Sequence, residues 1–143
     1  MKDCQCSECG ARYSSEGDSC AHRFEQLLAL DHSRREPWGS RHGHAFAAYA
    51  LSHPGEHARS LDTAWESLWR IYRLNESPAG VFASVRARKG KPTGLAGVPP
   101  RPSKRQTMPK VTIADLGEFS AETYAEQLDD WCRAALESWS TGS

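Results

Sequence analysis

Four of the five cysteines lie within the first 20 residues, and one pair has the spacing of a zinc knuckle. In Cys6-Ser-Glu-Cys9-Gly10, two thiolates can reach one ion from a tight turn, and the glycine relieves the backbone where the turn closes. Cys20 follows at the start of a predicted helix, where the helix dipole favours a thiolate. These three cysteines predict a tetrahedral zinc site that lacks one ligand. The alternative is free thiols, two on the surface and one buried.

The fourth donor has five candidates, which are Cys4, His22, His42, His44 and His53. Cys4 is close in sequence, but a C-x-C pair in an extended chain points its two sulfurs in opposite directions. His42 lies at the start of a predicted helix, on the stripe that faces the core. A core-facing histidine that binds no metal needs another polar partner. The predicted metal ligands are therefore Cys6, Cys9, Cys20 and His42, with Cys4 in reserve.

His53 is the candidate acid or base if the site is catalytic. Eleven residues of helix separate it from His42 by roughly 16 Å, so the two cannot share one ion. His53 precedes Pro54, which biases its backbone out of the helical region and can turn its ring toward a cleft. The simpler interpretation, which we favour, is a histidine at a helix end that binds the last carbonyls.

Composition favours a metal over disulfides. The sequence has no apolar run long enough to span a membrane, and its polar N-terminus lacks the apolar stretch of a secretory signal. We therefore expect a cytoplasmic protein with no membrane partner. Thiols stay reduced in that compartment, and the odd cysteine count agrees with zinc as the cofactor.

Apolar periodicity predicts the elements that position these residues. Amphipathic helices are expected over 20–31, 40–52 and 59–74, a shorter one after the cap Ser77, and a last one after the cap Ser120. Phe119 and Tyr124 are placed to form a hydrophobic staple at that last start. The fold class is mainly α, a single small domain of four to five helices. Its segments are the zinc knuckle loop 1–20, the helical core 21–88, the basic loop 89–110 and the C-terminal helical segment 111–139.

Charge is uneven although the formal net charge is zero. The stretch 86–110 carries basic residues and no Asp or Glu, so this loop could neutralise phosphates of a nucleic acid. Two observations argue against that partner: the loop has no aromatic residue for base stacking, and the rest of the chain is acidic. A solvated loop is the favoured interpretation.

The ordered motifs resemble a bacterial family known as domain of unknown function 5946. The resemblance is carried by Cys6-x2-Cys9-Gly10, by Cys20 before a helix with Phe24 and Leu27, and by His42-x6-Tyr49-x3-His53-Pro54. It continues through Val111-Thr-Ile-Ala-Asp-Leu116 to the helix with Trp131 and Trp139. The resemblance implies no activity, but it implies that the three cysteines, His42 and His53 form one functional set.

Three functions follow from these residues. The first is a structural Cys3His zinc site in an accessory or interaction protein, whose partner is a protein or a small molecule. The second is a small zinc enzyme with one open metal position, in which His53, Asp62 or Glu66 is the general base. The sequence lacks the H-E-x-x-H motif of zinc hydrolases, and we assign Asp62 and Glu66 to the solvated face of a helix. The third is a nucleic-acid-binding module that uses the loop 86–110.

Overall fold

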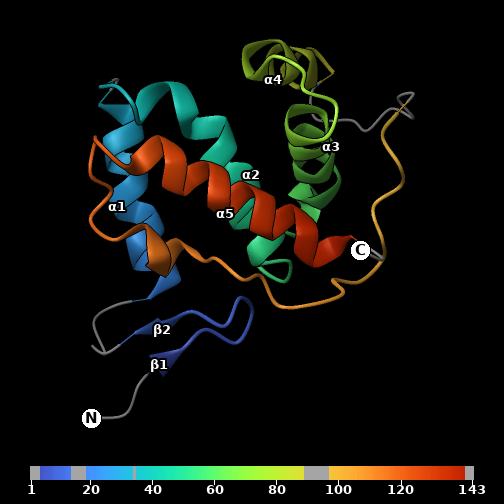
Figure 1. Cartoon of the computed structure of the whole chain (residues 1–143). Coiled ribbons are helices and arrows are strands. Elements are labelled where there is room, and N and C mark those ends of the chain that lie inside the picture. The colour runs from blue at the N-terminus through green and yellow to red at the C-terminus, as the bar shows by residue number, and fades with distance from the viewer. Residues whose placement is uncertain (1–3, 14–18, 34, 89–96, 141–143) are drawn as a thin grey trace.

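A computed structural model describes residues 4–13, 19–33, 35–88 and 97–140. Within these ranges the chain forms five α-helices, and Figure 1 shows their arrangement. They are α1 (Cys20–His32), α2 (His42–Ser52), α3 (Leu61–Tyr72), α4 (Pro78–Ala87) and α5 (Tyr124–Trp139). Two short antiparallel strands, β1 (Cys4–Gln5) and β2 (Arg12–Tyr13), form a hairpin before α1. The predicted mainly α fold with an N-terminal knuckle is confirmed.

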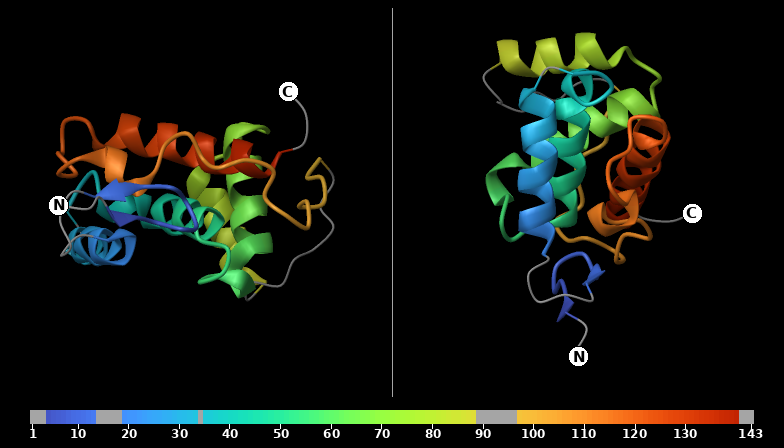
Figure 2. Two further views of the ribbon diagram at one scale, coloured as in Figure 1. Left: turned by 90° about the horizontal axis from the view of Figure 1, so that it is seen from below. Right: turned by 90° about the vertical axis from the view of Figure 1, so that its left-hand side faces the viewer.

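Helix α2 lies at the centre of the molecule, with α1, α3 and α5 packed around it (Figures 1 and 2). Four buried alanines let these neighbours approach its backbone closely; they are Ala45, Ala47, Ala48 and Ala50. Indoles then connect distant segments, because Trp139 donates to the Leu51 carbonyl at 2.8 Å and Trp38 donates to the Phe119 carbonyl at 2.9 Å. Helices α1, α2, α3 and α5 therefore share one apolar core. None of them is both long and apolar enough to span a membrane.

Two of the helices differ in detail from their sequence patterns. On α2, Phe46 lies four residues after His42 on the predicted core-facing stripe but is 36% exposed, whereas His44 is buried and its ring packs edge-on against Phe82. The stripe fails as a guide here because most sides of this alanine-rich helix are covered. Helix α5 begins at Tyr124 rather than directly after Ser120, since residues 121–123 form a turn. Phe119 and Tyr124 still make the expected contact, edge to face, with their ring centroids 6.4 Å apart.

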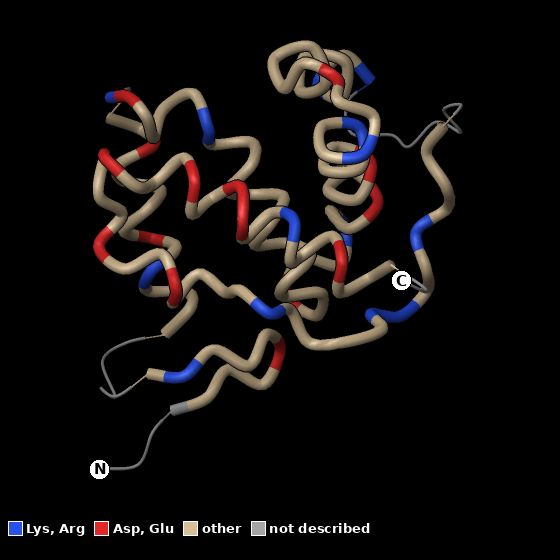
Figure 3. Tube along the Cα trace, viewed as in Figure 1, with Lys and Arg blue, Asp and Glu red and all other residues tan. Residues whose placement is uncertain are grey.

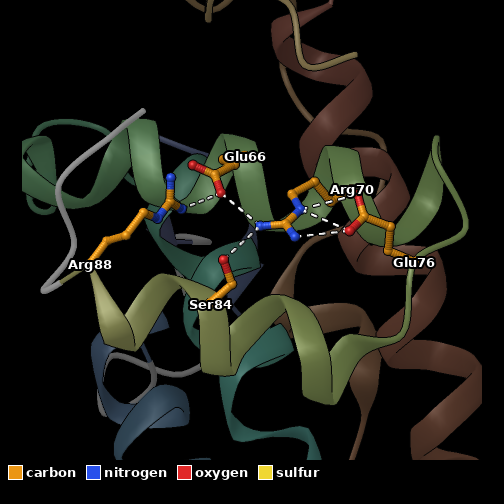
Figure 4. A network of polar contacts seen from close by, with 5 residues as sticks. All are labelled: Glu66, Arg70, Glu76, Ser84 and Arg88. Carbon is orange, nitrogen blue, oxygen red and sulfur yellow. Dashed lines mark hydrogen bonds and ion pairs between the residues drawn. The ribbon is translucent and has the colours of Figure 1, made fainter. Parts of the chain in front are cut away.

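Helix α4 is held against α3 by a network of charged side chains (Figure 4). Glu66 accepts from Arg70 at 3.0 Å and from Arg88, which follows α4 directly. Arg70 also pairs with Glu76 at 2.9 Å and donates to Ser84 of α4 at 3.4 Å. The expectation of a solvated Glu66 is wrong, because this carboxylate is only 5% exposed and has two arginine partners.

The described part of the predicted basic loop follows the surface of α3 and α5. Trp65 donates to the Pro99 carbonyl at 2.8 Å, and Trp69 donates to the Gly97 carbonyl at 3.0 Å. Further on, the Gln106 amide donates to the Ser138 carbonyl at 2.8 Å. Residues 97–110 are therefore fixed to the helices by hydrogen bonds, while residues 89–96 lie outside the described ranges.

We predict that Glu66→Gln lowers the free energy of unfolding by about 2–3 kcal/mol, because it leaves two half-buried arginines without their shared carboxylate. Urea denaturation followed by circular dichroism measures this loss. Glu76→Gln is the matched control, since it removes an exposed partner of the same Arg70. It should lower the free energy of unfolding by less than Glu66→Gln does. Equal losses in the two variants would contradict a special role for Glu66.

Candidate metal centre

Three cysteines and one histidine gather where the hairpin meets the helices. The donor atoms of Cys6, Cys9, Cys20 and His53 all lie within 4.8 Å of one another. The sulfurs of Cys9 and Cys20 are 3.5 Å apart. A tetrahedral ion bound at about 2.3 Å by sulfur requires donors about 3.8 Å apart, so this spacing suits one ion. The four residues are therefore positioned to bind a metal.

The Cys6–Cys9 turn has the geometry that its sequence predicts. The Gly10 amide donates to the Cys6 carbonyl at 2.9 Å, and the Cys6 amide donates to the Ala11 carbonyl at 2.8 Å. Gly10 has a φ of 82°, in the left-handed region where a side chain would be strained. The turn brings both sulfurs toward the helices, with Cys9 buried and Cys6 partly exposed.

Cys20 is the first residue of α1, and Ser19 caps that helix by accepting from the His22 amide. Its sulfur accepts a hydrogen bond from the Tyr13 hydroxyl at 3.0 Å. Hydrogen bonding from Cys9 lowers the pKa of Cys20 to about 4, with smaller contributions from His53 and Tyr13. The same contact raises the pKa of Cys9, so one thiolate forms readily here and a second is opposed by the first.

His53 follows α2 directly, at the point where Pro54 diverts the chain. Its backbone has φ −130° and ψ 65°, outside the helical region as the His-Pro pair predicts. Its Nδ1 atom lies 3.0 Å from the Tyr49 carbonyl, which the favoured helix-end interpretation expected. The other nitrogen, Nε2, is buried beside the thiols and has no hydrogen-bond partner among the described residues.

The His53 ring can contact the Tyr49 carbonyl through one nitrogen and bind a metal ion through the other. A proton on Nδ1 donated to the Tyr49 carbonyl leaves the Nε2 lone pair directed to the sulfurs, which is the usual arrangement of a metal-binding histidine. Burial is the largest single effect and would lower the pKa of His53, but the interactions with Cys20 and with the Tyr49 carbonyl together outweigh burial and raise this pKa. The cluster therefore favours a positive charge beside the ring, which a proton or a bound cation can supply.

The histidine in the cluster is His53 and not the predicted fourth ligand, His42. His42 lies outside the cluster, and its Nδ1 atom pairs with the buried Asp31 carboxylate at 2.9 Å. A core-facing histidine at this position needs a polar partner, and Asp31 of helix α1 is that partner without a metal. The reserve candidate Cys4 begins β1, and its side chain lies outside the described part of the structure.

Two residues that the sequence did not single out connect the knuckle to the end of α2. The Glu8 carboxylate accepts from the Gly55 amide at 2.6 Å. Arg105 donates to the carbonyls of both Glu8 and Ser52, the residue before His53. Because these contacts join segments far apart in sequence, only the folded chain identifies them. They hold the Cys6–Cys9 turn next to His53.

The basic residues of the loop are not gathered into one patch, and Figure 3 shows them spread along the described segment. Arg101 pairs with Asp62 at 2.8 Å and lies over the Trp139 ring. Arg105 is engaged with the knuckle, and Arg88 pairs with Glu66. Three cations of the predicted phosphate-binding loop therefore have partners within the protein.

We predict that the Asp31–His42 pair stabilises the fold mainly at acid to neutral pH. Hydrogen bonding to Asp31 raises the pKa of His42, so the pair contributes its full stability below the ordinary value of 6.5 and loses it as pH rises through the raised pKa. His42 is about half exposed, which limits the effect to about 1 kcal/mol. Chemical denaturation of wild type and His42→Gln across this range measures the difference, which should shrink at alkaline pH. A constant difference would contradict the prediction.

Comparison with known proteins gives one match. No curated protein and no solved structure matches the chain. One family model does match, described as Family of unknown function (DUF5946), and the match covers residues 4–140. It includes all four clustered residues and every helix, as the resemblance of the cysteine and His-Pro motifs led us to expect. The chain therefore belongs to this family of unknown function.

Proposed function

We propose that this protein binds one zinc ion through Cys6, Cys9, Cys20 and His53, and that the ion has a structural role. The observation that carries the proposal is the buried Nε2 atom of His53, which lies beside three thiols with no other partner among the described residues. An unsatisfied buried nitrogen costs free energy, and an ion shared with the sulfurs removes that cost.

The donor set supports zinc among the common metals. Thiolate and imidazole ligands suit zinc, whereas magnesium and calcium prefer oxygen ligands. Three thiolates also need a cation nearby, because Cys9 and Cys20 oppose each other's ionisation at 3.5 Å. A divalent ion stabilises all three and lets the thiols lose their protons.

A structural role is supported by the number and burial of the donors. Four protein ligands complete a tetrahedral shell and leave no position for water or substrate. Cys9, Cys20 and His53 are all at most 5% exposed. The ion would join the Cys6–Cys9 turn to the start of α1 and the end of α2. These bonds would add to the contacts that the apolar core already makes there. We therefore propose an accessory or interaction role rather than an enzymatic one.

The catalytic alternative has less support from the same residues. As a ligand, His53 is not free to act as acid or base. The two other candidate bases are engaged elsewhere, since Asp62 pairs with Arg101 and Glu66 pairs with two arginines. A hollow of about 290 Å³ lies beside Cys6 and His53, and a second of about 500 Å³ includes Cys9 in its lining.

We predict that the purified protein carries one zinc ion per chain and that His53→Ala loses most of it. His42→Ala is the matched control, because it removes a histidine from the other end of α2 and should retain the ion. Elemental analysis measures the stoichiometry. Replacement by cobalt adds a second measurement, since tetrahedral thiolate ligation gives visible absorption bands that should change in His53→Ala alone.

The opposite pattern, with zinc lost in His42→Ala and retained in His53→Ala, would overturn the ligand assignment. Two cysteine variants provide a further check, because Cys20→Ser should lose the ion and Cys132→Ser should retain it. Cys132 is fully buried in α5, away from the cluster, and burial raises its pKa. Retention of a full equivalent in Cys20→Ser would refute the site.

We also predict that removal of the ion by a strong chelator lowers the Tm by about 10 °C or more, because binding free energy to a site of this kind is also folding free energy. Differential scanning calorimetry of the chelated, reduced protein measures the shift, and added zinc should reverse it. A chelated protein with unchanged Tm and unchanged circular dichroism would show that no structural ion is present.

A further inference from the structure

A groove of about 790 Å³ lies between α2, α3 and α4. Helix α4, which forms one wall, is at the opposite end of the molecule from the hairpin and its cysteines (Figures 1 and 2). The volume falls within the range of small-molecule sites, roughly 300–1,000 Å³. The groove is therefore a feature separate from the metal centre.

The lining of the groove is apolar on its inner side. Phe46, Phe82 and Val85 contribute to it, with Ala47 and Ala64 at the base. Gly43 is required for this shape, because a Cβ atom there would lie 2.8 Å from the Phe82 ring. The glycine thus lets α4 approach α2 closely enough to form a wall. These surfaces suit the body of an aromatic or aliphatic molecule.

The charged residues of the lining are all basic. Arg59 and Arg86 are exposed there, no Asp or Glu is among the lining residues, and neither arginine makes an ion pair within the described part of the chain. Two acidic residues next to lining residues have partners, since Glu66 is held by two arginines (Figure 4) and Glu36 accepts from Ser40. In a chain that is acidic outside its loop, this combination favours an anion.

His42 adds a positioned donor to the same lining. Asp31 lies behind it and fixes its Nδ1 atom at 2.9 Å, so the ring cannot rotate freely. The carboxylate side chain is only 1% exposed, and that of His42 is 45% exposed. Its Nε2 atom has no hydrogen-bond partner among the described residues and is available to a ligand. A buried acid that hydrogen-bonds a histidine and orients its ring is a typical support for a binding group.

We propose that the groove binds a small molecule with an apolar body and a carboxylate group. The body lies on Phe46 and Phe82, and the carboxylate accepts from Arg59, Arg86 or the Nε2 atom of His42. A small molecule fits the volume better than a protein segment, whose interfaces bury far larger areas. This ligand site is independent of the proposed zinc ion.

The test uses naphthoate and its uncharged analogue naphthamide as probes, titrated into the full-length protein by calorimetry. Naphthoate should bind about tenfold or more tightly than naphthamide, because the charged hydrogen bonds form only with the acid. The double variant Arg59→Gln/Arg86→Gln should remove most of this preference. Lys104→Gln/Lys110→Gln is the control with the same change in net charge at exposed positions outside the groove, and it should keep the preference.

A second variant tests the place of binding. Ala79 is exposed and lines the groove, so Ala79→Trp should fill it without disturbing the core and should abolish binding of both probes. Equal affinity for the two probes, no binding of either, or a preference that survives Arg59→Gln/Arg86→Gln would overturn the proposal. So would a dimer in sedimentation that Ala79→Trp converts to monomer, because a second copy would then cover the groove. Zinc content measured on the same samples keeps this test separate from that of the metal site.

Discussion

The convergence of three sulfurs and one imidazole nitrogen is the constraint on which the N-terminal part of the structure depends. Cys9 and Cys20 are 3.5 Å apart and cannot both ionise without a compensating charge. The proposed zinc ion would remove that conflict and join the hairpin to two helices at once. The surrounding contacts serve the same arrangement: Tyr49 orients the histidine ring, Tyr13 donates to sulfur, and Arg105 holds the turn to the end of α2.

The sequence predicted those parts of the site that are local. The Cys6-x2-Cys9-Gly10 turn is set by its own spacing, and Cys20 by its place at a helix start. The histidine was not predicted, because the choice between His42 and His53 depends on which end of α2 meets the knuckle. The need of His42 for a polar partner was recognised correctly, but that partner is Asp31 of α1. The backbone bias of His53-Pro54 was the one local signal in favour of His53, the histidine that lies in the cluster.

The helices were predicted well where one face is apolar and less well where packing surrounds the element. Helix α3 has a clear stripe, because Leu61, Trp65 and Leu68 recur at i, i+4 and i+7 and all three are buried. Helix α2 is covered on most sides, so its alanines and not its aromatic stripe determine the packing. Long-range polar contacts are not encoded in local periodicity at all. The ion pair of Arg88 with Glu66 and the hydrogen bond of Arg105 to the Glu8 carbonyl become visible only when segments distant in sequence meet.

The order of the four clustered residues along the chain has a consequence for biosynthesis. All of them lie between residues 6 and 53, so the complete donor set is synthesised before α3, α4 and α5. Domains tend to fold from the N-terminus during translation. Capture of the proposed ion by the nascent chain would fix the hairpin, α1 and α2 as a template for α3 and α4, then for Arg105, and last for α5.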